Sequence, residues 1–149
     1  MGIPFECAEH PPALTTDEAD AYIEGREGVR TKTLFLCNRR AAAYYLVVMD
    51  DKKRLDMKRL EGLTGEKGMK FCSEERLMSK MGLPGGSVSL FGLLNNHERD
   101  IKVCLDKEIL AEKTATFLAN VNTCTVFISM YEMIKFITNL GYDYKILGL

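Results

Sequence analysis

The segment that most constrains the fold is Met81–Asn95, which reads Met-Gly-Leu-Pro-Gly-Gly-Ser-Val-Ser-Leu-Phe-Gly-Leu-Leu-Asn. It contains four of the 12 glycines of the chain, interleaved with apolar residues. A surface linker would be polar throughout, whereas Val88, Leu90 and Phe91 require part of this segment to be buried. Glycine permits turns and close approaches of the backbone that other residues do not. The pattern therefore predicts either a glycine-rich turn and a half-buried extended run lining a pocket, or a helix ending at Gly82 before an ordinary turn.

The length of 149 residues predicts a single domain over 1–149 that can bury a substantial core. The net charge of −1 gives no overall attraction to nucleic acid, so any RNA contact must come from a local basic patch. The one dense basic run consists of Lys52, Lys53, Arg54, Lys58 and Arg59. Such a run is usually a solvated face, and contact with phosphate is the alternative.

The five cysteines are scattered and form no Cys-x-x-Cys pair. This pattern argues against a disulfide framework and against a zinc site, and favours buried thiols in a reduced compartment. The chain shows no charged-then-apolar leader and no run of 18 apolar residues. We therefore expect no membrane association and a cytoplasmic location.

Alternation, turns and capping residues predict a mixed α+β (α/β) fold with six or seven strands and about four short helices. Two strands, Val29–Cys37 and Ala41–Met49, are expected to form a hairpin. Ser73 and Ser129 are expected to cap helices that end near Gly82 and Gly141. Further strands are expected near 3–7, 69–72, 90–94, 101–106, 124–130 and 142–147. Of these, 90–94 is expected to pair with 101–106. Short helices are expected to start near 15 and within 55–63.

The common signatures of enzyme sites are absent from the sequence. His10 and His97 have no metal-ligand spacing, and no Walker loop or dinucleotide fingerprint is present. Gly86-Ser87-Val88 resembles part of a nucleophile elbow, but Ser89 replaces its second glycine. Lys32 is unusual because it begins an otherwise apolar strand, and the ordinary interpretation is a strand-end lysine whose stem lies on the sheet.

Three blocks, in this order and spacing, resemble the prolyl-tRNA synthetase-associated editing proteins, the free-standing aminoacyl-tRNA deacylases of the YbaK/ProX type. The first is Gly-Val-Arg-Thr-Lys-Thr-Leu-Phe-Leu at 28–36. The second joins Phe-Cys-Ser-Glu-Glu-Arg-Leu at 71–77 to Gly-Ser-Val-Ser-Leu-Phe-Gly-Leu at 86–93. The third is Phe-Leu-Ala-Asn-Val-Asn-Thr-Cys-Thr-Val at 117–126. The resemblance covers nearly the whole chain and is nearest to the alanyl-tRNA(Pro) deacylase branch.

The resemblance implies a YbaK-like single domain that hydrolyses the ester between a wrong amino acid and a tRNA 3′ end, with no metal or cofactor. Its partners would be tRNA, with tRNA(Pro) first, and prolyl-tRNA synthetase. Lys32 would be the catalytic residue and would hold the phosphate region of the terminal nucleotide. The resemblance further implies a substrate-binding set of Thr33, Gly86, Ser87, Val88, Ser89, Phe91, Gly92, Leu118, Asn120, Asn122 and Thr123. Of these, Asn120, Asn122 and Thr123 would orient water or the ribose.

The sequence departs from the family pattern at three places in or beside this set. Leu90 stands where the family has proline, Thr33 where it has asparagine, and Leu118-Ala119 where it has His-Pro. Retained hydrolysis with an altered substrate preference is the first hypothesis. The second is a catalytically weakened relative that binds tRNA, an amino acid or a synthetase. The third is a small-molecule esterase that uses Ser87 or Ser89.

Overall fold

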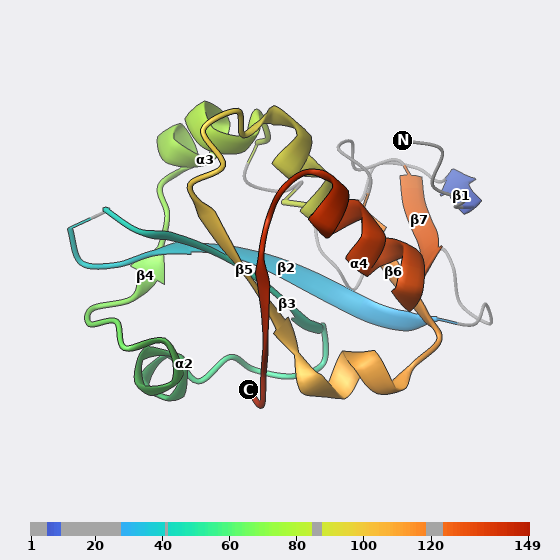
Figure 1. Ribbon diagram of the computed structural model, residues 1–149, viewed down its shortest axis with the longest axis horizontal. Helices are drawn as coiled ribbons and strands as arrows, with labels where there is room; N and C mark the ends of the chain where they lie inside the picture. Colours follow the sequence, from blue (N-terminus) through green and yellow to red (C-terminus); the bar gives the residue numbers. More distant parts are fainter. Residues whose placement is uncertain (1–5, 10–27, 41, 85–87, 119–123) are drawn as a thin grey trace.

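The computed structural model describes residues 6–9, 28–40, 42–84, 88–118 and 124–149, and over these residues a mixed sheet of eight strands forms the centre of the molecule (Figure 1). The strand order is β1-β7-β6-β2-β3-β5-β8, and β4 pairs separately with β2. The strands are β1 (Glu6–Glu9), β2 (Val29–Cys37), β3 (Tyr44–Asp50), β4 (Lys70–Phe71), β5 (Ile101–Asp106), β6 (Thr114–Leu118), β7 (Cys124–Ser129) and β8 (Tyr144–Leu147). The helices are α2 (Met57–Thr64), α3 (Glu74–Met81) and α4 (Met130–Asn139), with 3-10 helices η2 (Leu90–Asn95) and η3 (Lys107–Ala111).

Strand β2 connects the two halves of the sheet. Its residues 31–37 pair antiparallel with 50–44 of β3, which confirms the predicted hairpin. Its first two residues pair in parallel with Ala115 and Thr116 of β6, and its last two pair with β4. Because β2 is rich in β-branched, aromatic and aliphatic residues, it suits this central position. The predicted mixed α/β class is confirmed, with β6 as a strand that the sequence analysis did not identify.

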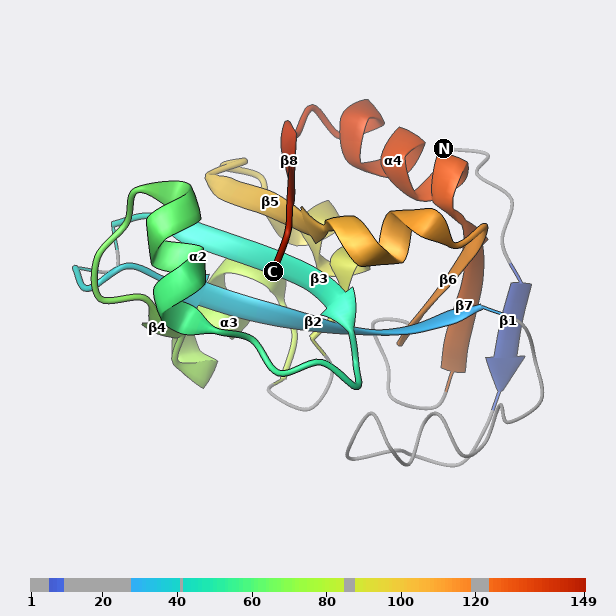
Figure 2. The same cartoon turned by 90° about the horizontal axis from the view of Figure 1, so that it is seen from below.

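The two faces of the sheet carry separate apolar cores because side chains alternate along each strand. One core joins Phe35 of β2 and Leu46 of β3 to buried residues of α3, η2 and α4. The other core joins Leu36 and Met49 to Leu60 of α2. Figure 2 shows α2 on its own side of the sheet, away from α4.

Local capping sets the ends of the helices as the sequence predicts. The Ser73 side chain accepts a hydrogen bond from the backbone N–H of Arg76, and Gly82 ends α3 in the left-handed conformation with φ 66°. The Ser129 side chain accepts from the backbone N–H of Glu132 at the start of α4. The helix expected near residue 15 and part of the strand expected near 3–7 lie outside the described residues.

The expectation that 90–94 forms a strand beside 101–106 is wrong. Residues 90–95 form η2, and both edges of β5 are taken by parallel partners, β3 and β8. Gly92 lets η2 approach α3 closely, because a Cβ at this position would lie 2.6 Å from Met81 Cε and 2.7 Å from Leu83 Cδ1. The alternative interpretation of the segment, a helix that ends at Gly82, is confirmed.

The cysteines follow the expectation in part. Cys37 and Cys104 are buried thiols, and burial raises the pKa of the Cys104 thiol to about 11. Cys7 is disulfide-bonded, which the scattered spacing did not predict. No helix among the described residues has the length and apolar character needed to cross a membrane.

Candidate functional site

Lys32 lies near the beginning of the β2–β3 pairing, opposite Met49. Its side chain is half-buried, and Nζ donates a hydrogen bond to the main-chain carbonyl of Lys53 in the turn after β3. An ammonium group has three N–H donors, so two donors of Lys32 remain for another acceptor. The strand position of the lysine is as expected, but its ammonium is bound by the main chain and does not simply project into water.

The Lys53 side chain extends from the same turn in another direction. Its Nζ lies 2.7 Å from Oδ2 of Asp106, 3.3 Å from Oε2 of Glu108 and 2.6 Å from the main-chain oxygen of Leu149. The hydrogen bond to Asp106 raises the pKa of Lys53, outweighing the opposing effect of burial. The Asp106 side chain is completely buried and the Lys53 side chain is 24% exposed, so the pair joins a buried carboxylate to a partly exposed ammonium at the end of β5.

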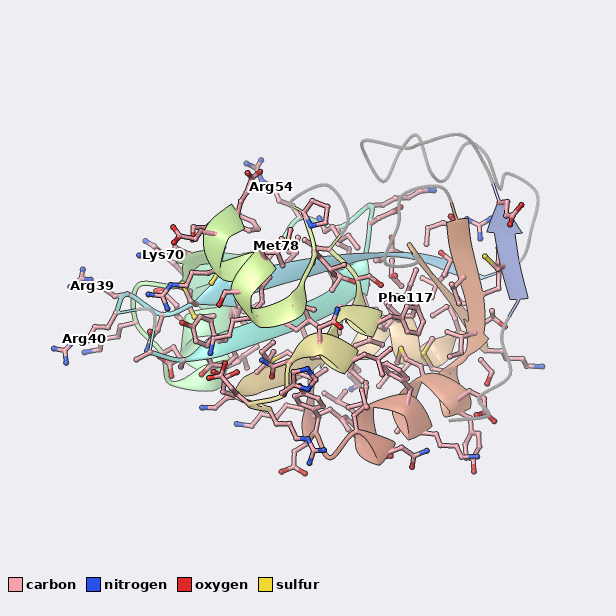
Figure 3. The ribbon with its side chains drawn as sticks, turned by 90° about the horizontal axis from the view of Figure 1, so that it is seen from above. Arg39, Arg40, Arg54, Lys70, Met78 and Phe117 are labelled. Atoms are coloured by element: carbon pink, nitrogen blue, oxygen red, sulfur yellow. The ribbon has the colours of Figure 1, made fainter. Side chains whose placement is uncertain are left out.

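The basic run of the sequence is therefore divided between two roles. Lys53 is bound to the buried carboxylate of Asp106, and Arg59 Nε donates to the main-chain oxygen of Gly148 at 2.6 Å. Lys52, Arg54 and Lys58 are exposed, and Figure 3 shows Arg54 extending into solvent. The sequence analysis did not identify the role of Lys53. The only sequence feature that could have indicated a buried partner for Lys53 was the single aspartate, Asp106, at the end of the apolar alternation of 101–106.

The glycine-rich segment is held in place by its 3-10 helix. Ser89 is completely buried, and its Oγ accepts a hydrogen bond from the backbone N–H of Phe91 at 3.3 Å. Leu90 is also completely buried in the core shared with α3 and α4. The core thus immobilises Leu90, the residue that stands where the resemblance described above implies a proline.

Aromatic contacts join the glycine-rich segment to β6 and α4. The ring of Phe91 makes edge-to-face contacts with Phe117, at 5.8 Å between centroids, and with Phe136, at 5.2 Å. Figure 3 shows Phe117 inside the molecule, at the junction of β6 with the core. Because Phe91 belongs to the second sequence block and Phe117 begins the third, these two blocks of the resemblance meet at this pair of rings.

The described residues do not bring the Lys32 ammonium against this segment. By alternation Lys32 shares a face with Leu36 and Met49, which belong to the core under α2, whereas Phe91 packs against the other core. Thr33 lies on the face that η2 occupies. Gly86, Ser87, Asn120, Asn122 and Thr123 lie outside the described residues, as does the side chain of Leu118, so a hollow shared by all of them stays a prediction.

A hollow of about 650 Å³ lies beside the start of β2, and the sequence analysis did not predict it. It is formed by residues 28–30, by Asp50 and Lys52 at the end of β3, and by residues 111–114. The guanidinium of Arg30 in its wall donates to the carbonyl of Gly28 at 3.0 Å and lies 5.8 Å from the centroid of the Phe127 ring. Cationic and anionic side chains both line it, so its charge alone selects no single class of ligand.

No three His, Cys, Asp or Glu side chains gather into a metal-binding group within the part of the chain that the structure describes. The carboxylates of Asp106 and Glu108 both bind the Lys53 ammonium.

A sequence model of the aminoacyl-tRNA editing domain family matches residues 10–136. The chain is 30% identical over 149 residues to the prolyl-tRNA editing protein ProX of Acetoanaerobium sticklandii, covering 100% of this chain and 91% of that protein. It is 25% identical over 152 residues to prolyl-tRNA synthetase associated domain-containing protein 1 of Bos taurus, covering 99% of this chain and 88% of that protein. The crystal structure of hypothetical protein APE2540 has the same fold, with a TM-score of 0.76 and 21% identity over 97% of this chain and 91% of the other.

Proposed function

This chain belongs to the aminoacyl-tRNA editing domain family, and we propose that it is a trans-editing hydrolase that removes the wrong amino acid from mischarged tRNA. The match that carries the proposal is the one to the prolyl-tRNA editing protein ProX, since it extends over the whole chain at 30% identity. We propose alanyl-tRNA(Pro) as the substrate. Small amino acids are those that a synthetase site rejects least well by size, so a second enzyme that removes them has a physical purpose.

Lys32 is the proposed anchor for the phosphate region of the terminal nucleotide. Its ammonium is half-buried and is directed by the carbonyl of Lys53, which leaves two donors for phosphate oxygens. A directed cation loses less conformational freedom on binding than a free surface lysine does. The two donors support this role. Because Lys32 and Phe91 lie toward different faces of β2, the position of the bound nucleotide between them is part of the proposal.

The proposed aminoacyl pocket uses the glycine-rich segment as one wall. Val88 and Phe91 are partly buried against the core, and Phe91 is held by two aromatic neighbours. A rigid wall of this kind can exclude larger side chains by size. Leu118, next to Phe117 in the chain, is proposed to complete the pocket and to set its amino-acid preference.

The proposed chemistry is hydrolysis of an already activated ester. The oxygen of a water molecule bonds to the carbonyl carbon, and the bond from that carbon to the ribose oxygen breaks. The leaving ribose oxygen takes the proton that the water loses. Backbone N–H groups around Gly86 and Ser87 are proposed to stabilise the developing oxyanion, and Asn120, Asn122 and Thr123 to orient the water or the ribose. Positioning of these groups can supply much of the acceleration, so we propose a reaction without metal or cofactor.

The second candidate is a relative that binds charged tRNA or a synthetase without hydrolysis. The features in its favour are the departures from the family pattern at Leu90 and at Leu118-Ala119. The esterase hypothesis is weakened for Ser89, because its hydroxyl is completely buried and caps η2. Ser87 lies outside the described residues.

The deciding experiment measures release of amino acid from a panel of mischarged tRNAs. We expect hydrolysis of alanyl-tRNA(Pro) and little hydrolysis of prolyl-tRNA(Pro). Lys32→Ala should lower kcat/KM by at least about tenfold, as expected for loss of a hydrogen bond to a charged group. Lys58→Ala removes an exposed lysine of α2 and serves as the control. Saturable binding without release for every tRNA would instead establish the binding module, and full activity of Lys32→Ala would remove Lys32 from its role.

A further inference from the structure

We propose that Lys53 is a positioning residue for Lys32. The Lys53 residue is held at both ends: its side chain is bound to Asp106, and its main-chain carbonyl receives the hydrogen bond from Lys32 Nζ. In this arrangement the ion pair with the buried Asp106 carboxylate fixes the turn, and the turn fixes the direction of the Lys32 ammonium. The catalytic consequence rests on the proposed function, whereas the positioning itself does not.

The anchor of this arrangement is the carboxylate of Asp106. The Asp106 side chain is completely buried, and besides Lys53 it accepts from the backbone N–H groups of Leu149, at 3.3 Å, and Glu108, at 3.5 Å. A buried carboxylate left without a cation is strongly unfavourable, so the Lys53 ammonium has no comparable alternative position. The side chain of Glu108 adds a second anionic partner at 3.3 Å.

The turn between β3 and α2 transmits this constraint to the carbonyl. The backbone N–H of Asp51 donates to the carbonyl of Arg30 on β2 at 2.9 Å, and that of Lys53 donates to the carbonyl of Asp50 at 3.1 Å. The backbone N–H of Lys52 donates to Asp50 Oδ1 at 2.9 Å. With the Lys53 side chain also fixed, the peptide group after Lys53 keeps one orientation, and its carbonyl faces Lys32.

A lysine needs such a constraint more than most residues do. Its four-carbon stem has many rotamers, and ordering it costs conformational entropy when a ligand binds. A carbonyl that accepts one of the three ammonium donors orders the stem before the ligand arrives. Loss of this constraint should therefore weaken substrate binding more than it slows the chemical step, and should raise KM with little change in kcat.

The first test observes Lys32 without using activity. The ¹H–¹⁵N signal of the Lys32 side-chain ammonium, assigned with Lys32→Ala, should be visible at low temperature in the wild-type protein because a hydrogen bond slows proton exchange. We expect Lys53→Met to abolish the signal, and both Lys53→Arg, which retains a cation for Asp106, and the control Lys52→Met to retain it. A Lys32 signal that is unchanged in Lys53→Met would overturn the proposal.

Because Lys53→Met leaves the Asp106 carboxylate without its cation, this variant can fail to fold. The double variant Lys53→Met/Asp106→Asn removes the orphaned charge, and the Asn oxygen can still accept from the backbone of Leu149. The same loss of the Lys32 signal is expected in this folded variant. Its retention there would overturn the proposal.

The second test uses the deacylation reaction. Lys53→Met should raise KM about tenfold, which is within the range for loss of a hydrogen bond to a charged group. In a Lys32→Ala background, the same Lys53→Met substitution should raise KM by less than about twofold. Full additivity of the two changes would show a purely structural role and overturn the proposal. If the wild-type protein hydrolyses no mischarged tRNA, the proposed function fails, and the ammonium signal still decides the role of Lys53.

Discussion

Substitution of Gly92 by alanine tests whether the close approach of η2 to α3 positions the glycine-rich segment. The new Cβ would lie 2.6 Å from Met81 Cε, 2.7 Å from Leu83 Cδ1 and 3.2 Å from Met81 Cβ. The first two atoms are ends of flexible side chains, but Met81 and Leu83 are themselves buried, at 0% and 2% exposure, and have little room to move. Overpacking of a dense core costs about 1–3 kcal/mol.

The expected loss can be converted into a thermal shift. For a domain of this size about 1 kcal/mol changes the melting temperature by about 3 °C, so Gly92→Ala should lower it by about 3–9 °C. Differential scanning calorimetry or denaturant unfolding measures the change. Combination with Leu83→Val should cost less than the sum of the two single changes, because the added methyl group occupies the space that Leu83 vacates.

Gly62 provides the matched control, since the same chemical change there should have the opposite sign. Gly62 lies within α2 and has no atom within 4 Å of an added Cβ. Alanine in an exposed helix is favoured over glycine by about 1 kcal/mol, so Gly62→Ala should raise the melting temperature by about 3 °C. A Gly92→Ala protein as stable as the wild type, or more stable, would refute the packing argument.

Three further predictions concern stability. Ser129→Ala should cost about 1 kcal/mol in denaturant unfolding, because the backbone N–H of Glu132 loses its capping acceptor; Ser129→Asn, which keeps an acceptor, should cost much less. A hydrogen bond from Tyr45 lowers the pKa of Glu66. The Glu66 carboxylate therefore stabilises the fold above the ordinary glutamate pKa, and this stabilisation is lost as pH falls through the lowered value. The free energies of unfolding of the wild type and Glu66→Gln, measured by urea titration, should converge at low pH. Burial raises the pKa of Tyr142 to about 12, so stability should fall as pH rises from about 10 toward 12, and Tyr142→Phe should show a smaller fall over that window.

Local interactions explain the features that the sequence predicted correctly. The β2–β3 hairpin follows from two apolar runs separated by a short turn, and the caps at Ser73 and Ser129 follow from a hydroxyl and an N–H three residues apart. Gly82 ends α3 because it adopts the left-handed conformation at φ 66°. Each of these interactions acts within a few residues, so one stretch of sequence is enough to reveal it.

The family was predictable from the sequence, but the arrangement of the candidate site residues was not. The three sequence blocks indicated the editing-domain family, which the family match from 10 to 136 confirms. The sequence did not reveal that the run 90–94 forms a 3-10 helix, because β3 and β8 occupy the two edges of β5 where that run was expected to pair. It also did not reveal that Lys32 and Phe91 lie toward different cores.

The sequence alone thus determined the class of fold, the helix ends and the family. Only the tertiary structure decided how Lys32 is held. The bond between Lys53 and Asp106 joins residues 53 positions apart, and nothing in the spacing of the chain marks them as partners. A buried charge finds its partner through the packing of distant segments, because the low polarity of the interior makes an unpaired ion unfavourable wherever the chain places it.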